Sequence, residues 1–221
     1  MMWPNPMVMC LTNTVAAGFT ANCLLAVGAK PAMVEEPAEA EELAAQADAI
    51  LVNLGTVTDV QAEAMRRAVR VAGEKRVPWV LDPVGAQCLA FRRQLALELL
   101  GMNPSLVRGN AAEIRALMEL VPDLPLRMAL LATGAVDRIS WRGGVEEICG
   151  GVPMLQLVTA TGCAQGGLCA FFLGRGQSPL AACRSASKLM KRAGEMAWRR
   201  AKAPGSFAVA LEDAMWELGR D

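Results

Sequence analysis

Short apolar runs alternate with helical periods along most of this chain. The apolar runs that are typical of buried strands lie at 7–11, 49–54, 79–81, 106–107 and 129–132. Between these runs, apolar residues recur every three or four positions, as they do on the buried face of a helix. Strands that alternate with helices in this way predict an α/β fold, with a largely parallel central sheet and helices on both faces.

Local signals predict where several helices begin. Thr58 and Gln61 have the spacing of a capping box, and Asn110 and Glu113 repeat it later in the chain. Ser178-Pro179 predicts the start of a long helix that reaches about Arg200. The helix after Thr58 is expected to bury one stripe of apolar residues, namely Val60, Ala64, Ala68 and Val71.

Two patterns describe the second half of the chain. The runs 139–141 and 145–148 flank Arg142-Gly143-Gly144 and predict a β-hairpin. Basic residues on the last long helix alternate with apolar ones, and we interpret them as a solvated face; they are Arg184, Lys188, Lys191, Arg192, Arg199 and Arg200. Because no repeat, low-complexity segment or linker interrupts residues 1–221, we expect a single domain.

Composition excludes several classes of function. The 22 basic residues balance the 22 acidic ones, so no net charge attracts nucleic acid or an anionic membrane. The chain has no His, which excludes a Ser-His-Asp or Cys-His nucleophile and a His-bound metal. The uncharged stretches 1–29 and 149–174 are interrupted by proline and glycine, so we expect no membrane span. With no targeting signal and seven cysteines that form no C-x-x-C pair, we expect a cytoplasmic protein with free thiols.

Polar residues gather at four predicted strand-to-helix junctions. In open α/β sheets, ligands bind outside the carboxyl ends of the strands, which is where these junctions lie. The four segments are Thr12-Asn13, Asp82-Pro83-Val84-Gly85, 108–113 (RGNAAE) and 159–163 (TATGC).

In their order along the chain, these segments resemble the motifs of hydroxyethylthiazole kinases, members of the ribokinase-like superfamily. The motifs are CLTN at 10–13, FTAN at 19–22, NLGT at 53–56, LDPVGA at 81–86, RGNAAEI at 108–114, ATGAVD at 132–137 and VTATGC at 158–163. The resemblance implies transfer of a phosphoryl group from ATP to the primary alcohol of 4-methyl-5-(2-hydroxyethyl)thiazole, in thiamin biosynthesis or salvage. It also implies a homotrimer with each active site at a subunit interface.

Thr161-Gly162-Cys163 is the segment expected to hold the phosphoryl group in transit. It ends an apolar run and opens a helix, where free amides and the positive helix end form an anion hole. The resembled family places a cysteine where Cys163 stands. A thiol at a helix N-terminus is expected to have a lowered pKa, so Cys163 could accept the proton of the substrate hydroxyl. The alternative is a small buried thiol in a packed turn.

Asp82 and Glu113 are the carboxylates expected to bind Mg²⁺, which prefers oxygen ligands. Alternatively, Asp82 caps its turn and Glu113 completes a capping box with Asn110. No Walker loop occurs in the sequence, and the guanidinium of Arg108 suits polyphosphate. By resemblance, Arg108 and Thr133 contact ATP, while Met33, Gly162 and Asn13 line the pocket of the thiazole alcohol.

Some segments depart from the resembled pattern. Ala160 stands for a glycine of the anion-hole turn, Gln87-Cys88-Leu89 replaces a glycine-rich turn, and the stretch 115–129 is short. They keep two alternatives open: a non-catalytic homologue that binds a small ligand or a protein partner, and a kinase for another small alcohol such as a hydroxymethylpyrimidine. We expect Val121-Pro122-Asp123-Leu124-Pro125 to end the helix that follows Asn110. The strands 106–107 and 129–132 should then be parallel neighbours, with Arg108 and Thr133 facing one nucleotide pocket.

Overall fold

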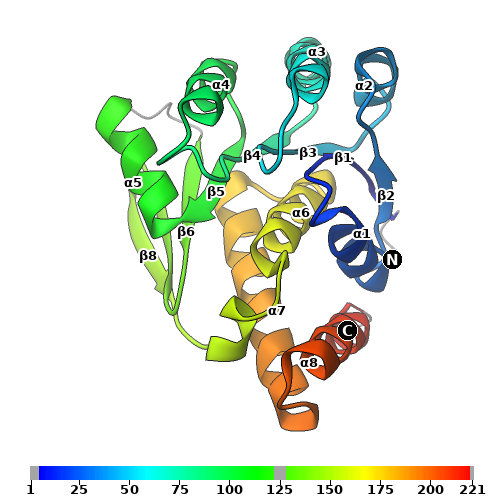
Figure 1. Ribbon diagram of the computed structural model, residues 1–221, viewed down its shortest axis with the longest axis vertical. Helices are drawn as coiled ribbons and strands as arrows, with labels where there is room; N and C mark the ends of the chain where they lie inside the picture. The colour runs from blue at the N-terminus through cyan, green and yellow to red at the C-terminus, as the bar shows by residue number, and fades with distance from the viewer. Residues whose placement is uncertain (1–4, 122–127, 220–221) are drawn as a thin grey trace.

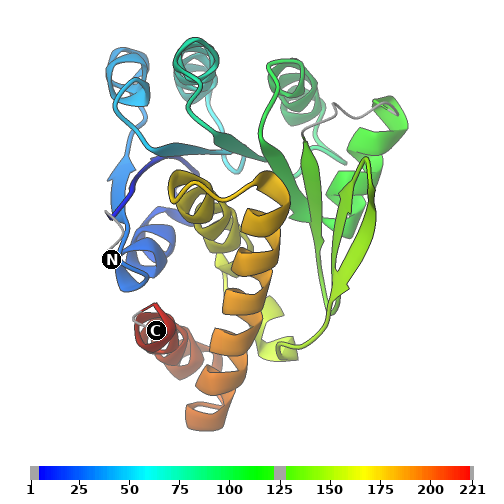
Figure 2. The same ribbon diagram turned by 180° about the vertical axis from the view of Figure 1, so that it is seen from behind.

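A mostly parallel sheet lies between two layers of helices in the computed structural model, which describes residues 5–121 and 128–219 (Figures 1 and 2). The strands are β1 (Met7–Leu11), β2 (Lys30–Met33), β3 (Ala49–Asn53), β4 (Trp79–Asp82), β5 (Leu106–Asn110), β6 (Ala129–Thr133), β7 (Asp137–Trp141) and β8 (Gly144–Ile148). The helices are α1 (Ala17–Ala26), α2 (Pro37–Ala44), α3 (Asp59–Lys75), α4 (Ala90–Leu100), α5 (Ala111–Leu120), the 3₁₀ helix η1 (Pro153–Gln156), α6 (Thr161–Gly174), α7 (Pro179–Arg200) and α8 (Pro204–Leu218).

The described strands pair in the order β2-β1-β3-β4-β5-β6-β7-β8. Every pair from β2 to β6 is parallel, whereas β6–β7 and β7–β8 are antiparallel. The predicted parallel sheet and the hairpin are therefore both confirmed. The parallel arrangement brings the carboxyl ends of β1 and β3–β6 to one edge of the sheet.

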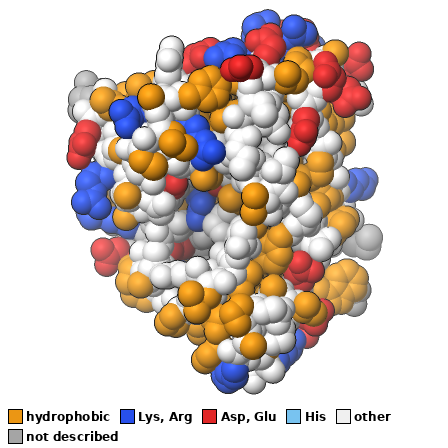
Figure 3. Space-filling view, viewed as in Figure 1, with side chains coloured by type: hydrophobic (Ala, Val, Ile, Leu, Met, Phe, Trp, Pro, Cys, Tyr) orange, Lys and Arg blue, Asp and Glu red, His pale blue; other side chains and the backbone are white. Residues whose placement is uncertain are grey.

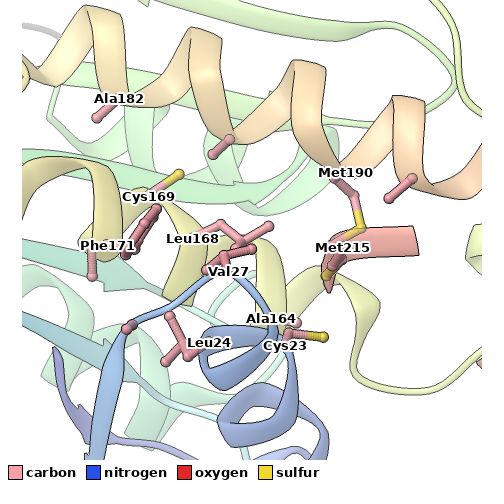
Figure 4. Packing of buried hydrophobic residues seen from close by; sticks show 14 of the residues in the cluster. Cys23, Leu24, Val27, Ala164, Leu168, Cys169, Phe171, Ala182, Met190 and Met215 are labelled. Atoms are coloured by element: carbon pink, nitrogen blue, oxygen red, sulfur yellow. The ribbon is translucent and has the colours of Figure 1, made fainter. Parts of the chain in front are cut away.

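Each face of the sheet has its own apolar core, because neighbouring residues of a strand point to opposite faces. In β3, Leu51 packs toward α1, α6, α7 and α8, and Ile50 packs toward the layer of α2–α5. Burial on both faces explains why this strand is an unbroken apolar run. Figure 4 shows Leu168, Cys169 and Phe171 of α6 at the centre of the first core.

Strand β2 was not predicted from the sequence. Its residues KPAM include Pro31 and show no apolar alternation. Proline is tolerated there because β2 is an edge strand, paired in the described sheet with β1 alone. The strand ends at Met33, opposite Cys10 of β1.

Two expectations about helix faces were confirmed only in part. Ala64 and Ala68 of α3 are buried as predicted, together with Met65, whereas Val60 is 55% exposed and Val71 is half-buried. Lys191 of α7 is only 5% exposed and makes internal contacts, so the solvated-face interpretation does not apply to it. Whether each of these side chains is exposed depends on the elements that pack against its helix, and residue spacing in the sequence does not specify those elements.

The short connection between β5 and β6 preserves the parallel pairing. Leu106 to Asn110 pair in register with Ala129 to Thr133, and α5 precedes β6. Helix α5 ends at Leu120, as predicted, and residues 122–125 of the predicted stop lie outside the described residues. Within the described part of the chain, no helix is long and apolar enough to cross a bilayer.

Candidate active site

Five polar side chains form one hydrogen-bonded chain across the ends of five neighbouring strands. Asn13, just after β1, donates to Asn53 Oδ1 at 2.8 Å, and Asn53 at the end of β3 donates to Asp82 Oδ2 at 2.7 Å. Arg108 of β5 reaches Asp82 Oδ2 with one Nη at 3.4 Å and Thr133 Oγ1 with the other at 2.7 Å. We call these five residues the strand-end network.

Asp82 is the most perturbed group of the strand-end network. Its side chain is fully buried at the end of β4, and its Oδ1 accepts no hydrogen bond from the described residues. Burial raises the pKa of Asp82 to about 7, although the Arg108 guanidinium acts in the opposite direction. A buried oxygen without a donor, at a ligand-binding edge, is suited to accept a cation.

Glu113 completes a capping box, as one of the sequence-based alternatives stated. Its Oε2 accepts the amide of Asn110 at 2.7 Å, while Asn110 Oδ1 accepts the amide of Glu113 at 2.9 Å. Its Oε1 also accepts the amide of Gly85 at 3.0 Å, which ties α5 to the turn after Asp82. Glu113 is therefore held beside the strand-end network.

These two carboxylates fit a magnesium ion unequally. Asp82 offers an oxygen without a partner, whereas both oxygens of Glu113 already accept an amide hydrogen. Among the described residues, no group of three Cys, Asp or Glu side chains could hold a metal. Water and substrate oxygens would have to complete the coordination, as is usual for Mg²⁺.

The first turn of α6 faces the strand-end network and leaves its amides open. Ala164 is the first residue whose amide bonds within this helix, to Ala160 O at 2.8 Å. No side chain among the described residues caps the helix start, because the N-cap residue Ala160 has no side-chain acceptor and Thr161 Oγ1 donates to Leu155 O at 2.8 Å. The amides of residues 161–163 are thus available for an anion.

Glycine at 162 allows Arg108 to lie directly over this helix end. A Cβ atom at position 162 would stand 2.6 Å from one guanidinium nitrogen of Arg108 and 2.9 Å from the other. Ala160, just before the helix, has a left-handed backbone with φ of 72°. That conformation favours glycine, the residue of the resembled pattern.

Cys163 lies at the helix start with its sulfur in reach of the strand-end network. Asn13 Nδ2 donates to Cys163 Sγ at 3.4 Å. Burial, together with the negative charge of Asp82, raises the pKa of Cys163. The expectation of a lowered pKa was wrong, because desolvation and Asp82 outweigh the favourable contribution of Arg108.

A cleft of about 290 Å³ opens beside Arg108, Thr133 and Gly162. Figure 3 shows a hollow left of centre with acidic and basic side chains at depth, between the β5–β8 side of the sheet and helices α6 and α7. Arg108 Nε is buried without a partner among the described residues. As expected, β5 and β6 are parallel, and Arg108 and Thr133 line one pocket.

The structure brings together seven of the eight residues selected from the sequence. The exception is Met33, which ends the edge strand β2 with 39% of its surface exposed. Asn53 was missed, although it ends a buried strand just as Asp82 does, and that signal was available. Asp137 and Lys191 were also missed; they form an ion pair of 3.3 Å beside the cleft.

Comparisons with known proteins agree with this geometry. The sequence model of the hydroxyethylthiazole kinase family matches residues 2–123 and 124–221 of this chain. A hydroxyethylthiazole kinase of Corynebacterium efficiens is 43% identical over 241 residues, covering 98% of this chain and 89% of that protein. One of Shigella boydii is 40% identical over 238 residues, with 98% and 91% covered.

Solved structures show the same fold. The hydroxyethylthiazole kinase protein from Pyrococcus horikoshii has a TM-score of 0.90 and 36% identity, covering 96% of this chain and 88% of its own. A pyridoxal kinase from Staphylococcus aureus, solved with AMP-PCP and pyridoxal, shares the fold alone, with a TM-score of 0.65, 15% identity and coverage of 86% and 88%. Sequence, fold and the strand-end motifs thus agree, and the chain belongs to the hydroxyethylthiazole kinase family.

Proposed function

We propose that this chain phosphorylates the primary alcohol of 4-methyl-5-(2-hydroxyethyl)thiazole with ATP. The single observation that carries the proposal is the position of Arg108, between the buried carboxylate of Asp82, the hydroxyl of Thr133 and the open amides of α6. A cation at this point can hold a phosphoryl group over a helix end while it is transferred. Catalysis of phosphoryl transfer is almost entirely positioning and charge stabilisation, which is what these groups supply.

ATP binds in the 290 Å³ cleft, with its outer phosphates toward Arg108. Arg108 Nε lacks a partner, so the guanidinium keeps a donor for a phosphate oxygen. Thr133 holds the other side of the guanidinium by accepting one hydrogen bond from it and donating its own proton to Gly109 O at 3.2 Å. This pair fixes the direction of the donor before nucleotide arrives.

The thiazole alcohol binds on the other side of the α6 helix start, near Asn13 and Gly162, with Met33 contributed by a neighbouring protomer. Cys163 accepts the hydroxyl proton as the alcohol oxygen attacks the terminal phosphorus. Its raised pKa means that the free thiol carries a proton at neutral pH, so only the thiolate fraction can act as the base. A loose transition state requires little early deprotonation of the attacking hydroxyl, which makes a sparsely populated base sufficient.

Asp82 and Glu113 would hold a magnesium ion, with Asp82 as the primary ligand. When bound, the ion would neutralise charge between the outer phosphates. Asn53 and Arg108 keep the Asp82 carboxylate oriented through Oδ2, which leaves Oδ1 free.

One assay tests the proposal against its alternatives. Purified protein is incubated with ATP, Mg²⁺ and a panel of thiazole and hydroxymethylpyrimidine alcohols, and the phosphorylated product is identified by mass spectrometry. We expect the thiazole phosphate and ADP in equal amounts. Preference for a pyrimidine alcohol would support the related kinase, and the absence of any product with bound ligand retained would support the non-catalytic homologue.

Assembly and location complete the proposal. We infer a cytoplasmic homotrimer in which Met33 of one protomer approaches the thiazole pocket of its neighbour. The exposed position of Met33 on an edge strand supports this role, as do the exposed apolar side chains Val15 and Val60. Light scattering tests the assembly, and a monomer that is fully active would remove Met33 from the site.

A further inference from the structure

The ammonium group of Lys191 lies inside a ring of four oxygen atoms. Its Nζ donates to the carbonyl oxygens of Gly134 at 3.3 Å, Ala135 at 3.1 Å and Gly150 at 3.2 Å. The fourth oxygen is Asp137 Oδ1, also at 3.3 Å. We call these four oxygens and the Lys191 ammonium the ammonium ring.

Within the ammonium ring, the side chains of Lys191 and Asp137 are buried, whereas the three residues that supply carbonyl oxygens are exposed. Asp137 is 3% exposed, accepts the amide of Gly134 on Oδ1 at 3.0 Å and accepts Gln165 Nε2 on Oδ2 at 2.9 Å. Gln165 of α6 also donates to Ser187 of α7 at 3.3 Å. The ring therefore sits in a cage that does not depend on Lys191 alone for its shape.

Lys191 joins the two turns that flank the β7–β8 hairpin. Gly134 and Ala135 follow β6, and Gly150 follows β8. One helical turn after Lys191, Glu195 accepts the amide of Gly151 at 2.7 Å. Lys191 and Glu195 thus hold the carbonyl and the amide of one peptide link, so α7 fixes the path of the second turn.

The first turn lines the nucleotide cleft, and both turns line a cavity beside it. Gly134 and Lys191 line the 290 Å³ cleft together with Arg108 and Thr133. They also line an adjoining cavity of about 140 Å³, whose wall includes Gly150. A shift of the first turn would change the shape of the cleft next to Thr133.

A ring of carbonyl oxygens with one carboxylate is the kind of environment that binds a potassium or ammonium ion. Lys191 fills this ring with a cation that belongs to the chain, so no free ion is needed. Removal of the side chain beyond Cβ would leave the buried Asp137 carboxylate without a counter-charge, beside three carbonyl oxygens. Because an unpaired buried charge is costly, a small monovalent cation would be stabilised at this point.

We propose that Lys191 is a positioning residue that acts as a tethered monovalent cation, and that its ring becomes a K⁺ or NH₄⁺ site when the side chain is truncated. The role in positioning rests on the proposed function, because it concerns the shape of the ATP cleft. The ion site itself does not, since it follows from the ring alone.

The experiment compares Lys191→Ala with Lys191→Met and Lys188→Ala. Methionine fills the space without a charge, and Lys188 is exposed on the same helix. For each variant, KM for ATP, KM for the thiazole alcohol, kcat and the unfolding temperature are measured in LiCl, NaCl, KCl and NH₄Cl at one ionic strength. The unfolding temperature needs no activity, so it separates failure of the ion site from failure of the proposed function.

In LiCl we expect Lys191→Ala to raise KM for ATP on the order of tenfold, with a smaller change in KM for the alcohol. KCl or NH₄Cl should restore both KM for ATP and the unfolding temperature in Lys191→Ala, but not in Lys191→Met. Lys188→Ala should behave as the wild type in every salt.

Equal behaviour of Lys191→Ala in all four salts would overturn the proposal, and so would equal recovery of Lys191→Met. If Lys191→Ala is insoluble in LiCl, purification in NH₄Cl replaces the comparison. The proposal then requires a folded protein that unfolds on dialysis into LiCl, and insolubility in both salts contradicts it.

Discussion

The strand-end network and the ammonium ring lie on adjoining walls of one cleft, yet they differ in how completely their polar atoms are paired. In the strand-end network, Asp82 Oδ1 and Arg108 Nε are buried without partners among the described residues. In the ammonium ring, Lys191 has four oxygen partners and both oxygens of Asp137 accept hydrogen bonds.

The unpaired atoms of the strand-end network are free to bind a ligand, whereas the paired atoms of the ammonium ring fix the shape of the cleft. A buried polar atom without a partner costs about 1–3 kcal/mol, which a ligand that pairs with it recovers. A ligand that pairs with the strand-end network therefore gains binding free energy, while the fully paired ammonium ring makes the wall of the cleft rigid. Substitutions in the first should change chemistry and metal use, and substitutions in the second should change the fit of ATP.

The largest effect is expected from Cys163→Ala, in which kcat should fall roughly 10²–10⁴-fold because the base is lost. KM for ATP should change little, the reverse of the pattern expected for Lys191→Ala. Steady-state kinetics at saturating alcohol measure both quantities, with Cys88→Ala as an exposed control. Wild-type turnover in Cys163→Ala would show that the sulfur is only a packed thiol.

The pH dependence of stability tests whether Asp82 is strained in the free protein. Its pKa is about 7 in the folded chain and near 3.9 when unfolded, so the folded state binds the extra proton between these values. The free energy of unfolding should fall as pH rises from about 4 to 7 and then level off. Each pKa unit is worth about 1.4 kcal/mol, which gives a few kcal/mol in total.

Urea unfolding of the wild type and Asp82→Asn across this range, without nucleotide or divalent ions, isolates the contribution. The difference between the two proteins should grow with pH in favour of Asp82→Asn. A constant difference would mean that the carboxylate is not perturbed.

Magnesium dependence compares Asp82 with Glu113, the two carboxylates that are expected to bind the ion. We expect Asp82→Asn to lower activity on the order of 100-fold at fixed magnesium, and Glu113→Gln on the order of tenfold, because Glu113 is already engaged by two amides. A magnesium titration of each variant, followed by ADP release, measures the shift. If neither variant loses rate or needs more metal, these carboxylates do not hold the ion.

The smallest effect concerns the backbone at the start of α6. A left-handed non-glycine residue costs about 1–2 kcal/mol, but glycine adds about 0.4–1 kcal/mol of unfolded-state entropy, so Ala160→Gly should stabilise by about 0.5 kcal/mol. Arg76→Gly, at φ of 60° on the far end of α3, is the matched control. Thermal unfolding measures both, and kcat should rise only in Ala160→Gly.

Four of the five residues of the strand-end network were selected from the sequence, because their signals are local. Asp82 and Arg108 follow buried apolar runs, and parallel strands bring such positions to one edge. The capping role of Glu113 was also visible in its spacing from Asn110. Whether these side chains bind metal and nucleotide stays a prediction.

Other features had no local signal. Lys191 is buried because carbonyl groups 56 and 57 residues earlier in the chain turn toward it. The raised pKa of Cys163 depends on its burial and on Asp82, which reaches it only through the folded sheet. Strand β2 contains a proline and little apolar pattern, so its own residues do not predict that it pairs with β1.

The close approach of Gly162 and Arg108 links the evolutionary fates of two distant positions. A Cβ at 162 would stand within 3.0 Å of the guanidinium, so replacement of this glycine requires Arg108 to shift from its present contacts. Drift at 162 is therefore easier once position 108 has shortened. Across relatives, the two sites should therefore vary as a pair, with the arginine lost first and the glycine second.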